Sequence, residues 1–332
     1  MAKYVVTVND FGRNNAGPKA KADINHFLKP LGYQIKIISP YPNKRLMRIF
    51  AINRWLKGLG PHDQLMIQFP TYSPWLEAKI DAVAKKQHVP MYFLVHDVEA
   101  LRMMKDIPGT VSRDVDELNR ADGLIVHNQH MRKWLADHGV TTPMVDLGIF
   151  DYDNPQPIHT STDFQPTVVF AGNLRKAHFL TKLHLKTTKL TIFGPAPAFD
   201  YPADVSYAGQ FTPTELPAHL TQCFGLVWDG SDTATCDGRY GNYMRYNDPH
   251  KASLYLSSGL PILIWKEAAL ADFVLDHGVG IAVDDLNHLD TILAKVTPAQ
   301  YAQMRQRADK LAVKLRQGYF TTTAVRAITK QH

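Results

Sequence analysis

The sequence predicts an α/β protein made of two doubly wound, Rossmann-like domains, in which helices cover both faces of a mostly parallel sheet. Two observations lead to this fold class. Short segments rich in Val, Ile and Phe alternate with helical patterns in both halves of the chain, as expected for parallel sheets that are buried on both faces. At 332 residues, the chain is also too long for one ordinary hydrophobic core, so two domains are expected.

The first half is a regular succession of short apolar segments and helical patterns. In order, the expected elements are strand 4–8, helix 19–32, strand 34–39, basic helix 43–60, strand 63–70, helix 75–87, strand 90–97, helix 112–121, strand 123–128, helix 129–139 and strand 143–147. The strands are short and bounded by polar residues, Gly or Pro, which favour turns.

The second half repeats this pattern. Its expected elements are strands 167–173, 189–194, 205–210 and 224–229, a helix near 213–221, a short helix from 250 that leads into a strand, a helix at 267–277, a strand at 279–283 and helices from about 298. Residues 152–166 contain three Pro and no apolar period, which favours a linker. We therefore expect an N-terminal domain at 1–151 and a C-terminal domain at 152–313, with a helix at about 314–332 that crosses back to the first domain.

Composition excludes several classes of protein. Hydrophobic residues make up 45% of the chain and charged residues 20%, which is typical of a globular protein. No uncharged apolar run is long enough for a membrane span, and the N-terminal segment does not fit a signal peptide. Two cysteines cannot form a disulfide framework, so we expect a cytoplasmic protein. Aromatic and basic residues are not interleaved on a recognisable module, so no nucleic-acid partner is expected. A homo-oligomer stays open.

The net charge of +6 lies entirely in the first half, where residues 1–150 hold 20 Lys and Arg against 14 Asp and Glu. The second half has 17 of each. Much of the excess lies in the segment 43–60, where Arg45, Arg48, Arg54 and Lys57 surround an apolar helical face. We favour a helix that covers a sheet and holds its cations in water. A patch that contacts anionic lipid at the inner face of the membrane, or an anionic acceptor, is the alternative.

Polar residues in the second half lie just after predicted strands. Ligands bind in doubly wound domains outside the carboxyl ends of the strands, so these residues are candidates for binding. They are Asn173, Arg175 and Lys176 after the first strand, Gly194 after the second, and Asp229 after the fourth. Glycine allows close approach of a backbone, and the cations suit a phosphate.

The stretch HKASLYLSSGLPILIW at 250–265 predicts a short helix with Lys251 at its N-terminus. Gly259 ends the helix, and Pro261 cannot continue it, so the next residues begin a strand. A helix N-terminus directs backbone N–H groups and a partial positive charge outward, to which Lys251 adds a full charge. The arrangement suits an anion. A Lys that is merely solvated is the alternative.

The sequence resembles a known family over nearly its whole length. FAGNLRK, GLVWD, HKASLYLSSGLPILIW and EAALADFVLDHGVG resemble the nucleotide-sugar domain of GT-B glycosyltransferases. QFPTYSP, FLVHDVEALR and ADGLIVHNQHMRKWL narrow the resemblance to a bacterial group. This group holds the glucosyltransferase 3 enzymes of serine-rich adhesin glycosylation and β-1,6-galactofuranosyltransferases. The resemblance implies two domains that face a central cleft.

It also implies a UDP-sugar co-substrate, a glycan acceptor on a protein or a lipid carrier, no other cofactor and no metal in the site. Lys251 and Lys176, with Arg175 beside it, would pair with the donor diphosphate. The turn at Gly194 would meet the uracil, and Glu267 or Asp272 the ribose. Tyr255, Asn173 and Asp229 are expected to complete the donor site.

The catalytic group is sought in the first domain. A transfer that inverts the anomeric centre needs a general base, for which His96, Asp97 and Asp10 are candidates because each follows a predicted strand. Gly12, Arg13 and Gly17 lie in a segment that would contact the phosphates or the acceptor. His96 and Asp97 could instead cap the next segment, and a retaining mechanism needs no base. A nucleotide-sugar epimerase and a non-catalytic partner subunit are the alternative functions.

Some residues imitate metal sites. The Asp-x-Asp pattern at 114–116 lies on a predicted helix, where positions i and i+2 do not share a face. The pattern at 151–153 lies at the linker and lacks the flanking apolar strand of a metal motif. The pairs His127/His130 and His178/His184 have no third ligand at a usable spacing, so exposed or capping histidines are expected.

Overall fold

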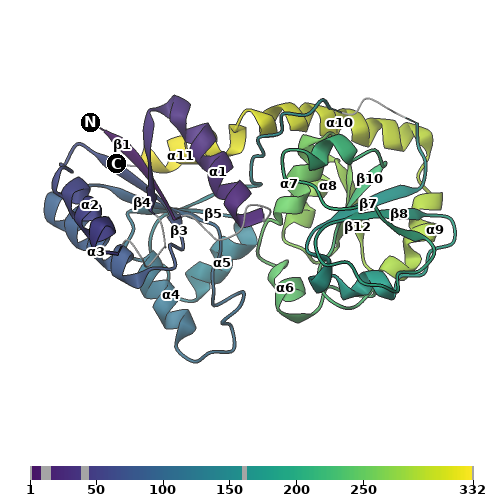
Figure 1. Ribbon diagram of the computed structural model, residues 1–332, viewed down its shortest axis with the longest axis horizontal. Helices are drawn as coiled ribbons and strands as arrows, with labels where there is room; N and C mark the ends of the chain where they lie inside the picture. Colours follow the sequence, from purple (N-terminus) through teal and green to yellow (C-terminus); the bar gives the residue numbers. More distant parts are fainter. Residues whose placement is uncertain (1, 9–15, 39–44, 159–162, 331–332) are drawn as a thin grey trace. The chain divides into compact units, whose positions relative to one another are not determined.

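The computed structural model describes residues 2–8, 16–38, 45–158 and 163–330, and the chain divides into two compact units. The N-terminal unit comprises residues 1–147 and 321–332, and the C-terminal unit comprises residues 148–320. Each unit is an α/β layer structure with its own parallel sheet, which confirms the predicted fold class (Figure 1).

The described part of the N-terminal unit holds a six-stranded sheet in the order β2-β1-β3-β4-β5-β6. The strands are β1 (Lys3–Val8), β2 (Tyr33–Ile38), β3 (Gln64–Phe69), β4 (Met91–Val95), β5 (Gly123–Val126) and β6 (Met144–Asp146). The helices are α1 (Ala16–Leu28), α2 (Arg45–Lys57), α3 (Pro74–Gln87), α4 (Thr110–Leu118), α5 (Gln129–Asp137) and α11 (Tyr319–Thr329). In Figure 1, α1 and α11 lie on one face of this sheet, and α2 and α3 on the other. The strand order reverses between β1 and β3.

The described part of the C-terminal unit also holds a six-stranded sheet, in the order β12-β11-β10-β7-β8-β9. The strands are β7 (Thr167–Ala171), β8 (Lys189–Phe193), β9 (Val205–Tyr207), β10 (Phe224–Val227), β11 (Ile262–Trp265) and β12 (Gly280–Val283). The α-helices are α6 (Gly238–Tyr243), α7 (His250–Ser257), α8 (Leu270–His277), α9 (Leu289–Ala294) and α10 (Pro298–Arg316), and 3₁₀ turns include η3 (Leu174–Lys176). The order reverses between β7 and β10, which is the place where such sheets bind ligands.

Apolar side chains on both faces of the central strands form the cores. Every residue of β3, β4, β10 and β11 is buried, as expected for strands covered by helices on two sides. Two glycines let helices approach closely. A Cβ on Gly225 would lie 2.2 Å from the Tyr255 ring of α7, and one on Gly123 would lie 2.6 Å from Ile328 of α11. The latter contact shows how the last helix packs on the sheet of the N-terminal unit.

The segment expected to be a linker is packed where it leaves the N-terminal unit. Asp151 and Tyr152 are buried, and the Tyr152 N–H donates a hydrogen bond to the Leu315 carbonyl at 3.2 Å. The chain passes from the N-terminal to the C-terminal unit at residue 148. The sequence analysis placed this boundary after residue 151. The predicted helix 314–332 is the end of α10 followed by α11, with Gly318 between them at a φ of 70°. Glycine adopts this left-handed conformation without strain.

Candidate functional site

The polar groups of the C-terminal unit gather at the β7/β10 switch point around Lys251. Lys251 is the second residue of α7, and its Nζ donates a hydrogen bond of 2.9 Å to the Trp228 carbonyl. The same Nζ lies 3.5 Å from Asp229 Oδ2 and 4.6 Å from the centre of the Phe170 ring. Phe170 belongs to β7, whereas Trp228 and Asp229 follow β10. The cation therefore spans the switch point, and its side chain is 15% exposed.

The position of α7 is fixed by its buried face. Tyr255 is 0% exposed, and its hydroxyl accepts a hydrogen bond of 2.6 Å from the Ala171 N–H at the end of β7. At the other end of the helix, Arg316 Nε donates to the Ser257 carbonyl at 2.7 Å, which satisfies a carbonyl of the last turn. Tyr255, which was expected to contact the sugar donor, therefore has a structural role. Its ring packs between α7 and Gly225 of β10, and its hydroxyl hydrogen-bonds to the backbone of β7.

The turns after β7 and β8 touch each other. Gly194 has a φ of 145°, and a Cβ there would lie 1.8 Å from the Gly172 carbonyl oxygen, so a side chain would force the turns apart. Asn173 Oδ1 accepts a 3.1 Å hydrogen bond from the Arg175 N–H and shapes η3. The side chains of Arg175 and Lys176 are exposed, and Lys176 Nζ lies 3.8 Å from the centre of the Tyr240 ring.

The loop after β10 is a part of this site that the sequence analysis missed. Asp237 organises it by accepting hydrogen bonds from the Ser231 hydroxyl at 2.7 Å and from the Asp232 N–H at 3.3 Å. Burial alone would raise the pKa of Asp237, but these hydrogen bonds outweigh it and lower the pKa. The Asp229 N–H donates to the buried Cys236 Sγ at 3.4 Å. Burial raises the pKa of Cys236, which keeps this thiol neutral. The feature of the sequence that could have pointed to this region is the run of aromatic and basic residues at 239–246, directly after the loop.

The two ribose candidates lie after β11. Glu267 forms an ion pair with Arg245, whose guanidinium stacks at 4.6 Å from the centre of the Trp265 ring. Asp272 is exposed in the first turn of α8. The structure ties Glu267 to the loop after β10 and places Asp272 on a helix, and both remain candidates.

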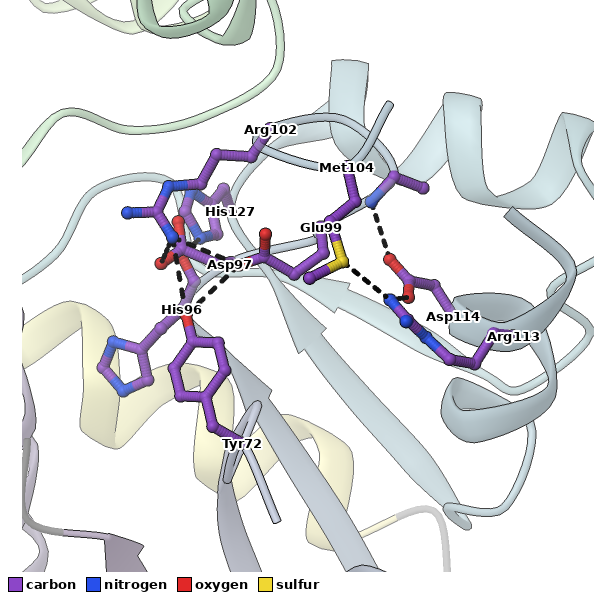
Figure 2. A network of polar contacts seen from close by, with 10 residues as sticks. Tyr72, His96, Asp97, Glu99, Arg102, Met104, Arg113, Asp114 and His127 are labelled. Carbon is purple, nitrogen blue, oxygen red and sulfur yellow. Dashed lines mark hydrogen bonds and ion pairs between the residues drawn. The ribbon is translucent and has the colours of Figure 1, made fainter. Parts of the chain in front are cut away.

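In the N-terminal unit, His96 and Asp97 follow β4 directly (Figure 2). His96 is partly exposed, and its backbone N–H donates to the Phe69 carbonyl at 2.7 Å. Its ring nitrogen Nε2 lies 2.8 Å from Gln68 Oε1. Asp97 forms an ion pair with Arg102 at 3.1 Å, and Arg102 also pairs with Glu99 at 3.2 Å. A carboxylate held by a guanidinium is a poorer base than a neutral imidazole, so His96 is the better candidate of the two.

The His127 ring hydrogen-bonds to the backbone of His96 from a buried position. This corrects the expectation that His127 is an exposed or capping histidine. His127 is buried, and its Nε2 donates to the His96 carbonyl at 3.0 Å. Burial lowers the pKa of His127 to about 4, so its ring is neutral at pH 7 and acts as a hydrogen-bond donor. Among the described residues, no group of three His, Cys, Asp or Glu side chains could hold a metal ion.

The Asp-x-Asp patterns are explained by structural contacts. Asp114 is buried and accepts a 2.8 Å hydrogen bond from the Ala100 N–H, whereas Asp116 points to solvent from the other side of α4. The buried Asp151 accepts from the Phe320 N–H at 3.2 Å. Asp114 and Asp116 therefore lie on different sides of α4, and Asp151 is bound to the backbone of its own unit.

Several predicted residues are only partly described. Asp10, Gly12 and Arg13 lie outside the described residues, as do the side chains of Arg45 and Arg48. Gly17, expected in a loop, lies in the first turn of α1 next to Pro18, where proline and glycine are tolerated because the first N–H groups have no partner in the helix. Arg54 and Lys57 of α2 are exposed, and Ile52 and Leu56 of the same helix are buried. Within the described ranges, no helix is both long and apolar enough to cross a bilayer.

Comparison with known proteins places this site in context. The family model "Glucosyltransferase 3-like, N-terminal domain" matches residues 2–149, and "Glucosyltransferase 3-like, C-terminal domain" matches residues 168–328. The chain is 30% identical to the β-1,6-galactofuranosyltransferase WbbI of Escherichia coli K12, over 96% of this chain and 95% of that protein. It is 27% identical to glucosyltransferase 3 of Streptococcus gordonii, over 91% of this chain and 90% of that protein.

Solved structures share the fold at low sequence identity. Sucrose-phosphate synthase from Thermosynechococcus elongatus has a TM-score of 0.65 at 12% identity and covers 100% of this chain and 99% of its own. A trehalose-6-phosphate enzyme from E. coli, solved with UDP-2-fluoro glucose, has a TM-score of 0.61 at 11% identity and covers 99% of both chains.

Proposed function

The chain belongs to the glucosyltransferase 3-like family of GT-B glycosyltransferases, and from this premise we propose that it moves a hexose from a UDP-sugar to a hydroxyl of a glycan acceptor. The acceptor is carried on a protein or a lipid. Glucose, N-acetylglucosamine, galactose and galactofuranose are the candidate sugars. Two of them are named in the relatives, one as a glucosyl and one as a galactofuranosyl transferase.

One observation carries the donor assignment, namely the placement of Lys251. A cation at the N-terminus of α7 lies at the switch point of a six-stranded parallel sheet, 3.5 Å from Asp229 and beside the turns that end β7 and β10. Switch points with a helix N-terminus bind phosphates in other doubly wound domains. Exposed Lys176 and Arg175 supply further positive charge at the turn after β7. We assign the diphosphate to these cations and the uracil to the turn at Gly194.

The cations replace a metal in this proposal. As the bond from the anomeric carbon to the diphosphate breaks, UDP leaves with the electron pair, and its growing negative charge needs a counter-charge. Lys251 and Lys176 provide it. His96 of the N-terminal unit takes the proton of the acceptor hydroxyl as that oxygen attacks the anomeric carbon.

The decisive experiment measures turnover of a panel of UDP-sugars with and without glycan acceptors. The donor is first identified by protection against thermal unfolding, because a ligand at 100 times its Kd adds about 2.7 kcal/mol of stability. Transfer that depends on an added acceptor supports the proposal. Isomerisation of the donor without an acceptor would identify an epimerase, and failure of UDP and every UDP-sugar to protect the protein would identify a non-catalytic subunit.

A further inference from the structure

A buried hydrogen-bond network holds Gln68 in one orientation. Gln68 is the fifth residue of β3 and is 0% exposed. Its Nε2 lies 2.6 Å from Thr7 Oγ1, 2.9 Å from Asn25 Oδ1 and 3.2 Å from the Lys21 carbonyl oxygen. A backbone carbonyl can only accept a hydrogen bond, so the side-chain atom that faces Lys21 must be the NH₂ group.

The remaining atoms of the network agree with this orientation. Asn25 Oδ1 accepts from the Thr7 hydroxyl at 2.9 Å as well as from Gln68, so Thr7 donates to Asn25 and accepts from Gln68. If the Gln68 amide were turned over, its oxygen would face the Lys21 carbonyl oxygen, which can only accept. It would also face Asn25 Oδ1, which is an acceptor, and the Thr7 hydroxyl, which already donates its proton to Asn25. A flipped amide would leave buried acceptors facing one another, which is costly.

The orientation of Gln68 determines which nitrogen of His96 carries a proton. Gln68 Oε1 lies 2.8 Å from His96 Nε2, and an amide oxygen can only accept. His96 Nε2 therefore donates, and in the neutral ring Nδ1 holds the lone pair. The backbone of His96 is fixed on both sides, because its N–H donates to Phe69 and its carbonyl accepts from His127.

We propose that Gln68 is a positioning residue that locks His96 in the Nε2–H tautomer, so that Nδ1 is the atom that accepts the proton of the acceptor hydroxyl. This inference rests on the proposed function and adds the identity of the reacting nitrogen. In the step, the acceptor oxygen forms a bond to the anomeric carbon and its proton moves to Nδ1. The bond from that carbon to the diphosphate oxygen breaks, and UDP keeps the electron pair. The ring becomes a cation whose Nε2–H still donates to Gln68.

The first arm of the test needs no substrate. Two-bond ¹H–¹⁵N spectra of protein labelled at histidine, recorded at a pH where the rings are neutral, distinguish the two tautomers. The His96 signals are assigned by their loss in His96→Gln. We expect Nε2 to be protonated and Nδ1 to be unprotonated in the wild type. A wild-type ring protonated at Nδ1 overturns the inference.

The second arm removes the acceptor from His96. Gln68→Met keeps the length of the side chain but has no acceptor at Oε1, so the ring should populate both tautomers. Gln64→Met is the matched control, since Gln64 is a buried glutamine at the start of the same strand. The control should keep the wild-type spectrum, and an unchanged spectrum in Gln68→Met contradicts the locking role. Thermal unfolding of both variants shows that the comparison is made on folded protein.

The third arm measures transfer. In Gln68→Met we expect kcat to fall roughly 10- to 100-fold, a part of the 10²–10⁴-fold that a general base contributes, with an unchanged KM for the donor. Gln64→Met should retain the wild-type kcat. A Gln68→Met spectrum that changes as expected while kcat stays at the wild-type value overturns the assignment of Nδ1 as the proton acceptor. If no UDP-sugar is turned over, the proposed function fails, and the spectra still decide whether Gln68 locks the tautomer.

Discussion

Replacing Lys251 by Ala should weaken the binding of UDP while the fold survives. The Lys251 side chain is 15% exposed, and its ammonium group contacts the Trp228 carbonyl, the Asp229 carboxylate and the face of the Phe170 ring. An ammonium group has three N–H donors, so it can keep the Trp228 contact while it donates to a phosphate oxygen. The substitution therefore removes a charge-assisted hydrogen bond from the bound state.

The magnitude follows from the type of contact. A hydrogen bond to a charged group contributes about 1.5–3 kcal/mol, which corresponds to a rise in Kd of roughly 10- to 150-fold. The effect on stability should be smaller, because Asp229 is 28% exposed and can be solvated once its partner is removed. Transfer activity should fall at least as much as UDP affinity, since the charge on the leaving diphosphate grows in the transition state.

The assay is titration calorimetry of UDP with Lys251→Ala and with a charge-matched control. Lys189→Ala serves as the control, because Lys189 pairs with Asp204 at 2.7 Å and lies at the first residue of β8, the end of the strand away from the proposed site. The control should bind UDP like the wild type. Equal UDP affinity of Lys251→Ala and Lys189→Ala, with both variants folded, would refute the reasoning that places the diphosphate at α7.

Four further outcomes are expected. The pKa of His127 is about 4 in the folded protein against an ordinary value of 6.5, so the unfolded chain binds the proton more tightly. The free energy of unfolding should therefore fall by up to about 3 kcal/mol as the pH drops from 6.5 through 4. Urea titrations should show this loss flattened in His127→Gln. Tyr255→Phe should lower stability by about 1–3 kcal/mol in the same assay, because the buried Ala171 N–H loses its acceptor. Transfer should persist in EDTA, and activity that is lost in EDTA and restored by manganese would contradict the role given to Lys251 and Lys176. Co-sedimentation with anionic vesicles should not differ between the wild type and a variant with Arg45, Arg48, Arg54 and Lys57 changed to Gln, whereas binding that is lost in the variant and at high salt would identify α2 as a membrane contact.

Much of the fold could be predicted because its signals are local. Strands such as β4 and β11 are buried on both faces, so their sequences are continuous apolar runs. Such a run can be recognised without knowing which distant residues pack against it. The end of α7 follows from Gly259 and Pro261, which stop the helix just before β11. The boundaries at 148 and 320 could not be read in this way. They depend on the packing of Tyr152 against the end of α10, which is a contact between residues far apart in the sequence.

The candidate site was predicted where one side chain follows one strand, and missed where several elements meet. The sequence analysis assigns Tyr255 to the donor site, and the structure buries it. Its burial under the helix depends on the absence of a side chain at Gly225 on a different element. The loop that Asp237 organises after β10 was overlooked, since its hydrogen bonds are visible only in three dimensions.

The polar network around Gln68 links the chemistry of the N-terminal unit to its topology. Thr7 lies on β1, Gln68 on β3 and His96 just after β4, so the network crosses the β1/β3 reversal of the strand order. Buried amides are costly unless every donor and acceptor is paired, and apolar residues would fill this part of the core without that requirement. The sequence QLMIQF has a glutamine at this point of a strand whose every residue is buried. We infer that its cost is balanced by the position it gives to the His96 ring. The same place in the other sheet, the β7/β10 reversal, holds Lys251. Each unit thus has its proposed reactive side chain close to its own switch point, a base in one and a cation in the other.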